Sequence, residues 1–98
     1  MKNERELQGR CLKWARLQGV FGRKVETPAY IGFPDCLFLY KGRVLLVEFK
    51  HPNGTGKLSP LQERDHERLA AVDVKPKVID SFDAFKCLIR GWMNEHAR

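Results

Sequence analysis

The chain has 98 residues, 43% of them hydrophobic, and its 18 basic and 12 acidic side chains give a net charge of +6. This length suits one domain, residues 1–98, with one modest core, and the positive charge favours a polyanionic partner. No stretch approaches the roughly eighteen consecutive apolar residues of a membrane span, and residues 1–6 do not resemble a signal peptide. We therefore expect no membrane association and a cytoplasmic location.

The first part of the chain predicts a helix and a short strand. In residues 3–18, apolar side chains such as Leu7 and Cys11 recur at helical spacing, and Gly19 lies just past the predicted end. A short strand is expected over residues 23–27. The following residues, up to Phe33, are interrupted by proline and glycine and predict an irregular loop.

Two apolar runs then predict a β-hairpin with strands at 35–40 and 43–50, joined by Lys41-Gly42. With a two-residue turn, Asp35 lies directly opposite Glu48, and such opposed side chains have Cβ atoms about 4.5–5.5 Å apart. Two negative charges at that distance repel by about 3 kcal/mol at an effective dielectric constant of 20, so a cation is expected between them. Carboxylate oxygens suit Mg²⁺ or Mn²⁺. Because the second run is apolar on both faces over residues 44–47, we expect it to form a central strand.

The remaining elements complete an α/β pattern. After a loop at 51–58, Ser59-Pro60-Leu61-Gln62 predicts the start of a helix that extends to about residue 71. Residues 74–79 predict a strand that Pro76 places at an edge or at a bulge. The last helix, 81–95, carries an apolar stripe of Phe82, Phe85, Ile89 and Trp92. The predicted order is αβββαβα, a mixed sheet flanked by helices.

Four short motifs resemble one family when taken together. The pair Gly32-Phe33-Pro34-Asp35 and Glu48-Phe49-Lys50 resembles the PD-(D/E)xK nuclease motif, with its restriction-endonuclease-like core. An early Glu4…Gln8 and the later Ser59-Pro60-Leu61-Gln62 extend the likeness to the VRR-NUC family over roughly residues 4–80.

The resemblance implies a Mg²⁺- or Mn²⁺-dependent DNA endonuclease, a homodimer that cuts four-way (Holliday) junctions or related branched DNA, in a bacterial or phage-infected cell. Asp35, Glu48 and the main-chain carbonyl of Phe49 would bind the metal. Lys50 would orient the attacking water and offset charge on the phosphate. Part of the apolar stripe of residues 81–95, or the surface near Tyr30 and Phe33, would form the two-fold interface.

Two assignments stay open at this point. Either Glu4 or Gln8 delivers the helical contact to the metal. The alternative for Glu4 is a solvated residue at a helix end. Glu6 faces away and can pair with Arg10. Gln62 either faces the metal site or only closes the capping box with Ser59, and these roles are compatible.

Other polar residues and other functions fit less well. We expect His51, Asn53 and His66 to be solvated, and the three cysteines, which form no CxxC pair, to be reduced and buried. A sequence-specific restriction-type endonuclease shares the motif, but 98 residues leave no room for a recognition subdomain. A non-catalytic DNA-binding module with a nuclease fold is disfavoured because Asp35, Glu48 and Lys50 are all intact.

Overall fold

The computed structural model describes residues 2–95, so Met1 and residues 96–98 of the predicted 1–98 domain lie outside the described residues. The elements follow the predicted order αβββαβα. Their bounds are α1 (Glu4–Leu17), β1 (Phe21–Lys24), β2 (Cys36–Tyr40), β3 (Arg43–Phe49), α2 (Pro60–Ala70), β4 (Lys77–Ile79) and α3 (Phe82–Met93). Among residues 2–95, no helix combines the length and apolar character that crossing a membrane requires.

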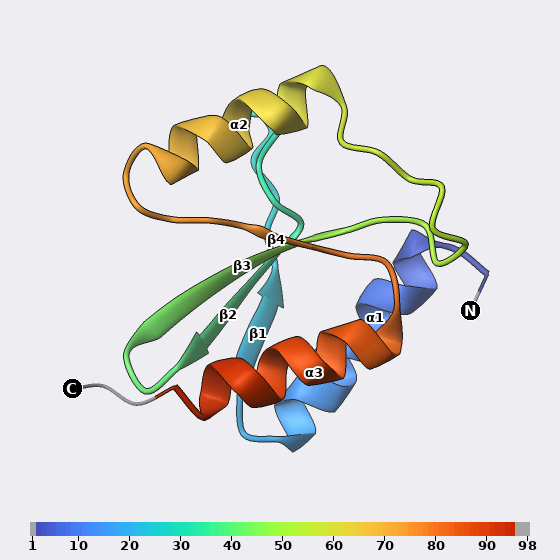
Figure 1. Cartoon of the computed structure of the whole chain (residues 1–98), viewed down its shortest axis with the longest axis vertical. Coiled ribbons are helices and arrows are strands. Elements are labelled where there is room, and N and C mark those ends of the chain that lie inside the picture. Colours follow the sequence, from blue (N-terminus) through green and yellow to red (C-terminus); the bar gives the residue numbers. More distant parts are fainter. Residues whose placement is uncertain (1, 96–98) are drawn as a thin grey trace.

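The four strands form one mixed sheet in the order β1-β2-β3-β4. The first three strands pair antiparallel, and β4 joins β3 in parallel. In Figure 1, α1 and α3 lie together on one side of the sheet, and α2 lies apart on the other side. The central position of β3 and the edge position of the strand after Pro76 are therefore confirmed.

The core lies between the sheet and the pair α1 and α3. The helices contribute apolar side chains at helical spacing, and β2 and β3 contribute alternate residues. The ring of Phe85 in α3 lies at its centre, 5.3 Å from the ring of Phe38 and 5.9 Å from that of Phe49. This packing holds the β2–β3 hairpin rigidly against two helices.

The predicted hairpin register is confirmed. Tyr40 pairs with Arg43 and Cys36 pairs with Val47, around a turn in which Lys41 and Gly42 both have positive φ, 48° and 77°. Positive φ at both central residues is typical of the type I′ turn, whose twist matches that of antiparallel strands.

Some boundaries differ from the predictions. β1 occupies Phe21–Lys24 rather than residues 23–27, because the chain reverses at Gly19 (φ 87°) and buries Val20 before the strand begins. β4 keeps only Lys77–Ile79, since Pro76 lacks the N–H that would extend the ladder. Val44 is 55% exposed, so the buried run of β3 starts at Leu45.

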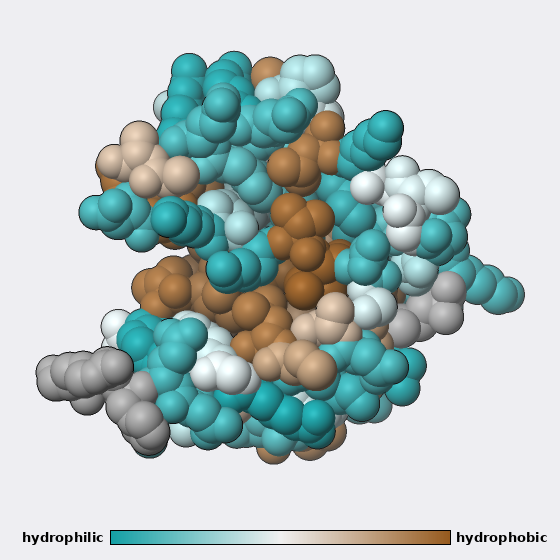
Figure 2. All heavy atoms as spheres, in the orientation of Figure 1, coloured by the Kyte–Doolittle hydropathy of each residue, from teal (hydrophilic) through white to brown (hydrophobic). Residues whose placement is uncertain are grey.

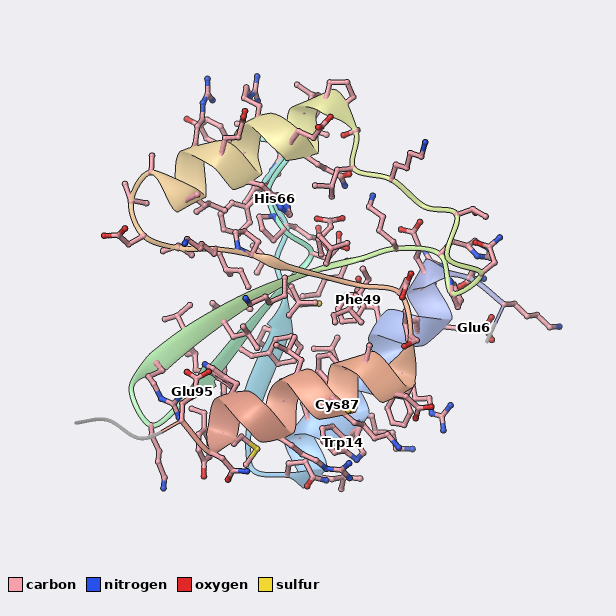
Figure 3. The ribbon with its side chains drawn as sticks, viewed as in Figure 1. Glu6, Trp14, Phe49, His66, Cys87 and Glu95 are labelled. Carbon is pink, nitrogen blue, oxygen red and sulfur yellow. The ribbon has the colours of Figure 1, made fainter. Side chains whose placement is uncertain are left out.

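Two expectations for α3 are wrong. Phe85, Ile89 and Trp92 are buried in the chain's own core, so this stripe does not supply a two-fold interface. Cys87 is exposed rather than buried, because it lies two residues, about 200° of helical turn, from Phe85 (Figure 3). Cys11 and Cys36 are buried free thiols, as expected, and burial raises the pKa of each to about 12.

Candidate active site

The β2–β3 hairpin brings the two predicted carboxylates together. Asp35 and Glu48 occupy the opposed positions one step beyond the last paired residues, Cys36 and Val47. The main-chain N–H of Phe49 donates to Asp35 Oδ2 at 2.8 Å, and the N–H of Val25 donates to the Asp35 carbonyl at 2.8 Å. Asp35 is therefore fixed from both neighbouring strands.

Glu48 and Lys50 project from the sheet face opposite the core. Successive strand side chains point to alternate faces, so the burial of Val47 and Phe49 in the core directs residues 48 and 50 to the other side. Both side chains are nonetheless enclosed, with Glu48 1% and Lys50 8% exposed. Lys50 Nζ lies 3.9 Å from Glu48 Oε2, so the two form a shielded ion pair.

Gln62, in the first turn of α2, connects this pair to the helix. Its Oε1 accepts from the main-chain N–H of Ser59 at 2.9 Å and from Lys50 Nζ at 2.8 Å, and its Nε2 donates to Glu48 Oε2 at 2.8 Å. Ser59 Oγ accepts from the Gln62 N–H in return, which completes the capping box. One amide group thus closes the capping box and also bonds to Glu48 and Lys50.

A close approach of backbone to backbone sets the distance between α2 and the loop that carries Asp35. A Cβ built on Gly32 would lie 2.1 Å from the carbonyl oxygen of Leu61. Only a residue without a side chain allows this contact. Gly32 therefore docks the Gly-x-Pro-Asp segment on the first turn of α2, next to Gln62.

The electrostatics of the cluster favour a bound cation. Burial and the nearby charge of Asp35 raise the pKa of Glu48 to about 8, while the charge of Lys50 lowers it. Glu48 Oε1 is buried and has no hydrogen-bond partner among the described residues. A buried acceptor of this kind needs a donor or a metal. The orphaned oxygen and the adjacent carboxylate fit a hard divalent cation with oxygen ligands.

The whole chain resembles a solved structure described as a VRR_NUC domain. The match has a TM-score of 0.81 and 27% sequence identity, and it covers 94% of this chain and 99% of that one. The chain has the fold of a VRR-NUC domain. No protein-family model matches the sequence, and no curated protein matches it. The similarity between this chain and the VRR-NUC domain is thus found in the three-dimensional structure, which is a nuclease fold.

The α1 helix places Glu4 close enough to Glu48 for their charges to interact, but it closes no full ligand cage among the described residues. Glu4 is exposed, yet its charge contributes to the raised pKa of Glu48. Gln8, one turn further, is half-buried. Within residues 2–95 no group of three His, Cys, Asp or Glu side chains converges on one point. The structure brings Asp35, Glu48, Lys50 and Gln62 together, and of the two candidate residues in α1 only Glu4 acts on Glu48 through its charge.

Glu6 lies on another side of α1, as expected, but its predicted partner is wrong. Glu6 Oε1 accepts from the main-chain N–H of Lys2 at 3.0 Å, and no Glu6–Arg10 ion pair forms among the described residues. The Arg10 guanidinium instead lies 4.0 Å over the ring of Phe82. A cation–π contact thus takes the place of the expected helical ion pair.

His66 is the polar residue whose position the sequence did not predict. It lies on the face of α2 turned toward the sheet (Figure 3), and its Nε2 is buried without a hydrogen-bond partner in the described chain. Burial lowers its pKa, and the charges of Asp65, Lys50 and Asp35 also act on it. The signal was its spacing of four residues from Gln62, which shares a helix face. His51 is separate from it, because its Nδ1 accepts from the N–H of Asn53 in a local turn.

Proposed function

We propose that this VRR-NUC domain is a metal-dependent DNA endonuclease that hydrolyses phosphodiester bonds in branched DNA. The observation that carries the proposal is the enclosed cluster of Asp35, Glu48, Lys50 and Gln62, in which one carboxylate oxygen lacks a partner. An unpaired acceptor buried beside a second carboxylate lowers the stability of the fold by about 1–3 kcal/mol. A bound metal would compensate for this loss, whereas a non-catalytic module would gain nothing from it.

Asp35 and Glu48 would hold Mg²⁺ or Mn²⁺, with the Phe49 carbonyl as a further ligand and Glu4 or Gln8 reached from α1. The metal supplies Lewis-acid polarisation of the phosphate and a more acidic water. Lys50 orients the nucleophile and offsets negative charge that develops on the phosphate. Gln62 holds the Lys50 ammonium and the Glu48 carboxylate in fixed positions, since it bonds to both.

DNA as the substrate rests on the nuclease fold and on the net charge of +6. Contacts from lysine and arginine to phosphates bind DNA without reading its sequence. A preference for branched substrates, with four-way junctions first, follows from the family resemblance and would require paired cuts in two strands. A homodimer would provide the two sites.

The surface that could support this dimer lies beside β3 and β4. Figure 2 shows a band of apolar residues across the face between α2 and α3. Val44 of β3, Val72 of the α2–β4 connection and Val78 of β4 are 55%, 68% and 46% exposed. Exposed apolar surface of this extent often marks a protein interface.

The test is cleavage by the purified chain of duplex, single-stranded, flap and four-way junction DNA, with Mg²⁺, Mn²⁺, Ca²⁺ or EDTA. We expect cutting of branched DNA in Mg²⁺ or Mn²⁺, none in EDTA, and binding with little cutting in Ca²⁺, which coordinates with loose geometry. The variant Lys50→Ala should cleave poorly in the same assay. Lys86→Ala is its matched control, since Lys86 pairs with Asp83 in α3, away from the candidate site. Full activity in EDTA after metal removal would overturn the metal mechanism, and no cutting of any substrate would leave only a DNA-binding module.

A further inference from the structure

A recess opens beside the candidate active site, between the β1–β2 loop and the second half of α2. It has a volume of about 430 Å³ and mostly apolar walls. Its lining consists of Thr27, Tyr30, Phe33, Asp65, Arg68 and Leu69. This volume lies within the range of about 300–1,000 Å³ that is usual for small-ligand sites.

The loop side of the recess is held in shape before any ligand binds. Thr27 Oγ1 donates to the Tyr30 carbonyl at 2.7 Å, and the Tyr30 N–H donates to the Thr27 carbonyl at 2.9 Å. Gly32 then fixes the same loop to α2 through its contact with Leu61. Because the loop is ordered in advance, binding there would cost little conformational entropy.

The recess adjoins the proposed site of cutting. Phe33 in its wall is two residues from Asp35, so their Cα atoms lie at most about 7 Å apart. Asp65 in its wall lies three positions, about one helical turn, after Gln62, which bonds to Glu48 and Lys50. A nucleotide next to a phosphate held by Asp35 and Glu48 is therefore within reach of the recess.

Asp65 gives the apolar recess one polar acceptor. The residue is 8% exposed, and its Oδ1 lies 3.6 Å from Arg64 Nε and 4.0 Å from Arg68. Both distances exceed the range of about 2.7–3.2 Å for a hydrogen bond, so the carboxylate keeps acceptor capacity. Arg68, which lines the recess, places positive charge there, where a sugar–phosphate backbone would pass.

We propose that this recess binds one unstacked nucleobase of the DNA strand cut at the neighbouring site, and that Asp65 favours bases with an exocyclic amino group over thymine. The inference rests on the proposed function. Aromatic and apolar walls suit the faces of a base, the carboxylate suits an amino group such as cytosine N4, and Arg68 suits its phosphate. A second copy of the chain fits less well, because the arginines would face an equally basic partner.

The experiment measures binding of short single-stranded and branched DNA in Ca²⁺ or EDTA, with one abasic nucleotide moved stepwise along the strand. In the wild type we expect one position at which losing the base weakens binding about tenfold, as loss of one stacked base should. Tyr30→Ala should bind intact DNA as weakly as the wild type binds that abasic DNA, and it should no longer respond to the abasic position. Ile31→Ala is the control, since Ile31 is the next residue, 78% exposed and outside the recess lining.

At the sensitive position, the wild type should bind cytosine more tightly than thymine, and Asp65→Asn should reduce that difference. The inference is overturned if no position is sensitive, if Tyr30→Ala keeps the abasic penalty, or if Tyr30→Ala only changes the oligomeric state in light scattering. Metal-dependent cutting without a sensitive position would refute the recess and keep the nuclease. A sensitive position without cutting would keep the recess and refute the nuclease.

Discussion

Replacing Gly32 by alanine is expected to damage both stability and catalysis, although it adds one methyl group. An ideal Cβ at this position lies 2.1 Å from the Leu61 carbonyl oxygen and 2.6 Å from the Leu61 carbonyl carbon, while real Cβ contacts are not below 3.0 Å. The loop and α2 must therefore separate by at least 0.9 Å at this point. Both partners are backbone, so no flexible side chain can absorb the shift.

The expected destabilisation is about 1–3 kcal/mol, the usual cost of overpacking. For a chain of this size, each kcal/mol lowers the melting temperature by about 4–8 °C. Because the loop carries Asp35 and the helix carries Gln62, a displacement near 1 Å should also slow cleavage by about a hundredfold.

Thermal unfolding followed by circular dichroism and single-turnover cleavage of junction DNA check the two effects. Gly91→Ala is the control, since its built Cβ meets no atom of another part of the described chain within 4 Å, and alanine in a helix is more stable than glycine by about 0.5–1 kcal/mol. A Gly32→Ala protein with the wild-type melting temperature and cleavage rate would contradict the docking role of Gly32.

Four further outcomes are expected. Lys50→Ala should bind DNA almost normally but cleave at least about a hundredfold more slowly, and Asp35→Asn should abolish cutting with the fold retained, as judged by gel-shift, cleavage and circular dichroism. Glu4→Ala should weaken cleavage more than Glu6→Ala, and a larger loss in Gln8→Ala would move the helical contact one turn along. The folded pKa of Glu48, about 8, exceeds its ordinary 4.5, so the folded state binds a proton more tightly than the unfolded state does. The metal-free protein should therefore lose stability, on the order of a few kcal/mol, as pH rises from 5 to 8 in thermal melts. Glu48→Gln or added Mn²⁺ should flatten this profile. Light scattering at micromolar concentration should show a dimer that Val78→Asp converts to a monomer, and a strictly monomeric wild type with unpaired nicks would refute a junction-resolving dimer.

The sequence could predict the fold because its signals were local and strong. Ser59-Pro60-Leu61-Gln62 determined where α2 begins, and Lys41-Gly42 determined the hairpin register that opposes Asp35 and Glu48. The register follows from the length of the turn alone, so no tertiary contact had to be known.

The missed features depend on contacts between distant segments. The approach of Gly32 to Leu61 joins two elements 29 positions apart in the chain, and only the folded structure shows that a Cβ has no room there. His66 looked like one polar residue among several on a charged helix, until the sheet behind α2 enclosed its Nε2. Cys87 stands at an apolar position of the sequence pattern, which predicts burial, although its angular position on α3 directs it outward.

The amide of Gln62 also couples the folding of the first turn of α2 to the geometry of the candidate active site. Asp65, 8% exposed, is the one buried residue of α2, and no residue of this helix belongs to the hydrophobic core, so its first turn should open more readily than the sheet. Each opening breaks the cap at Ser59 and releases Lys50 and Glu48 in the same event. The rate of hydrogen exchange at the amides of Gln62 and Glu63 should then report the fraction of molecules in which this turn is open and cleavage is not possible. On heating, cleavage should be lost several degrees below the temperature at which the sheet unfolds.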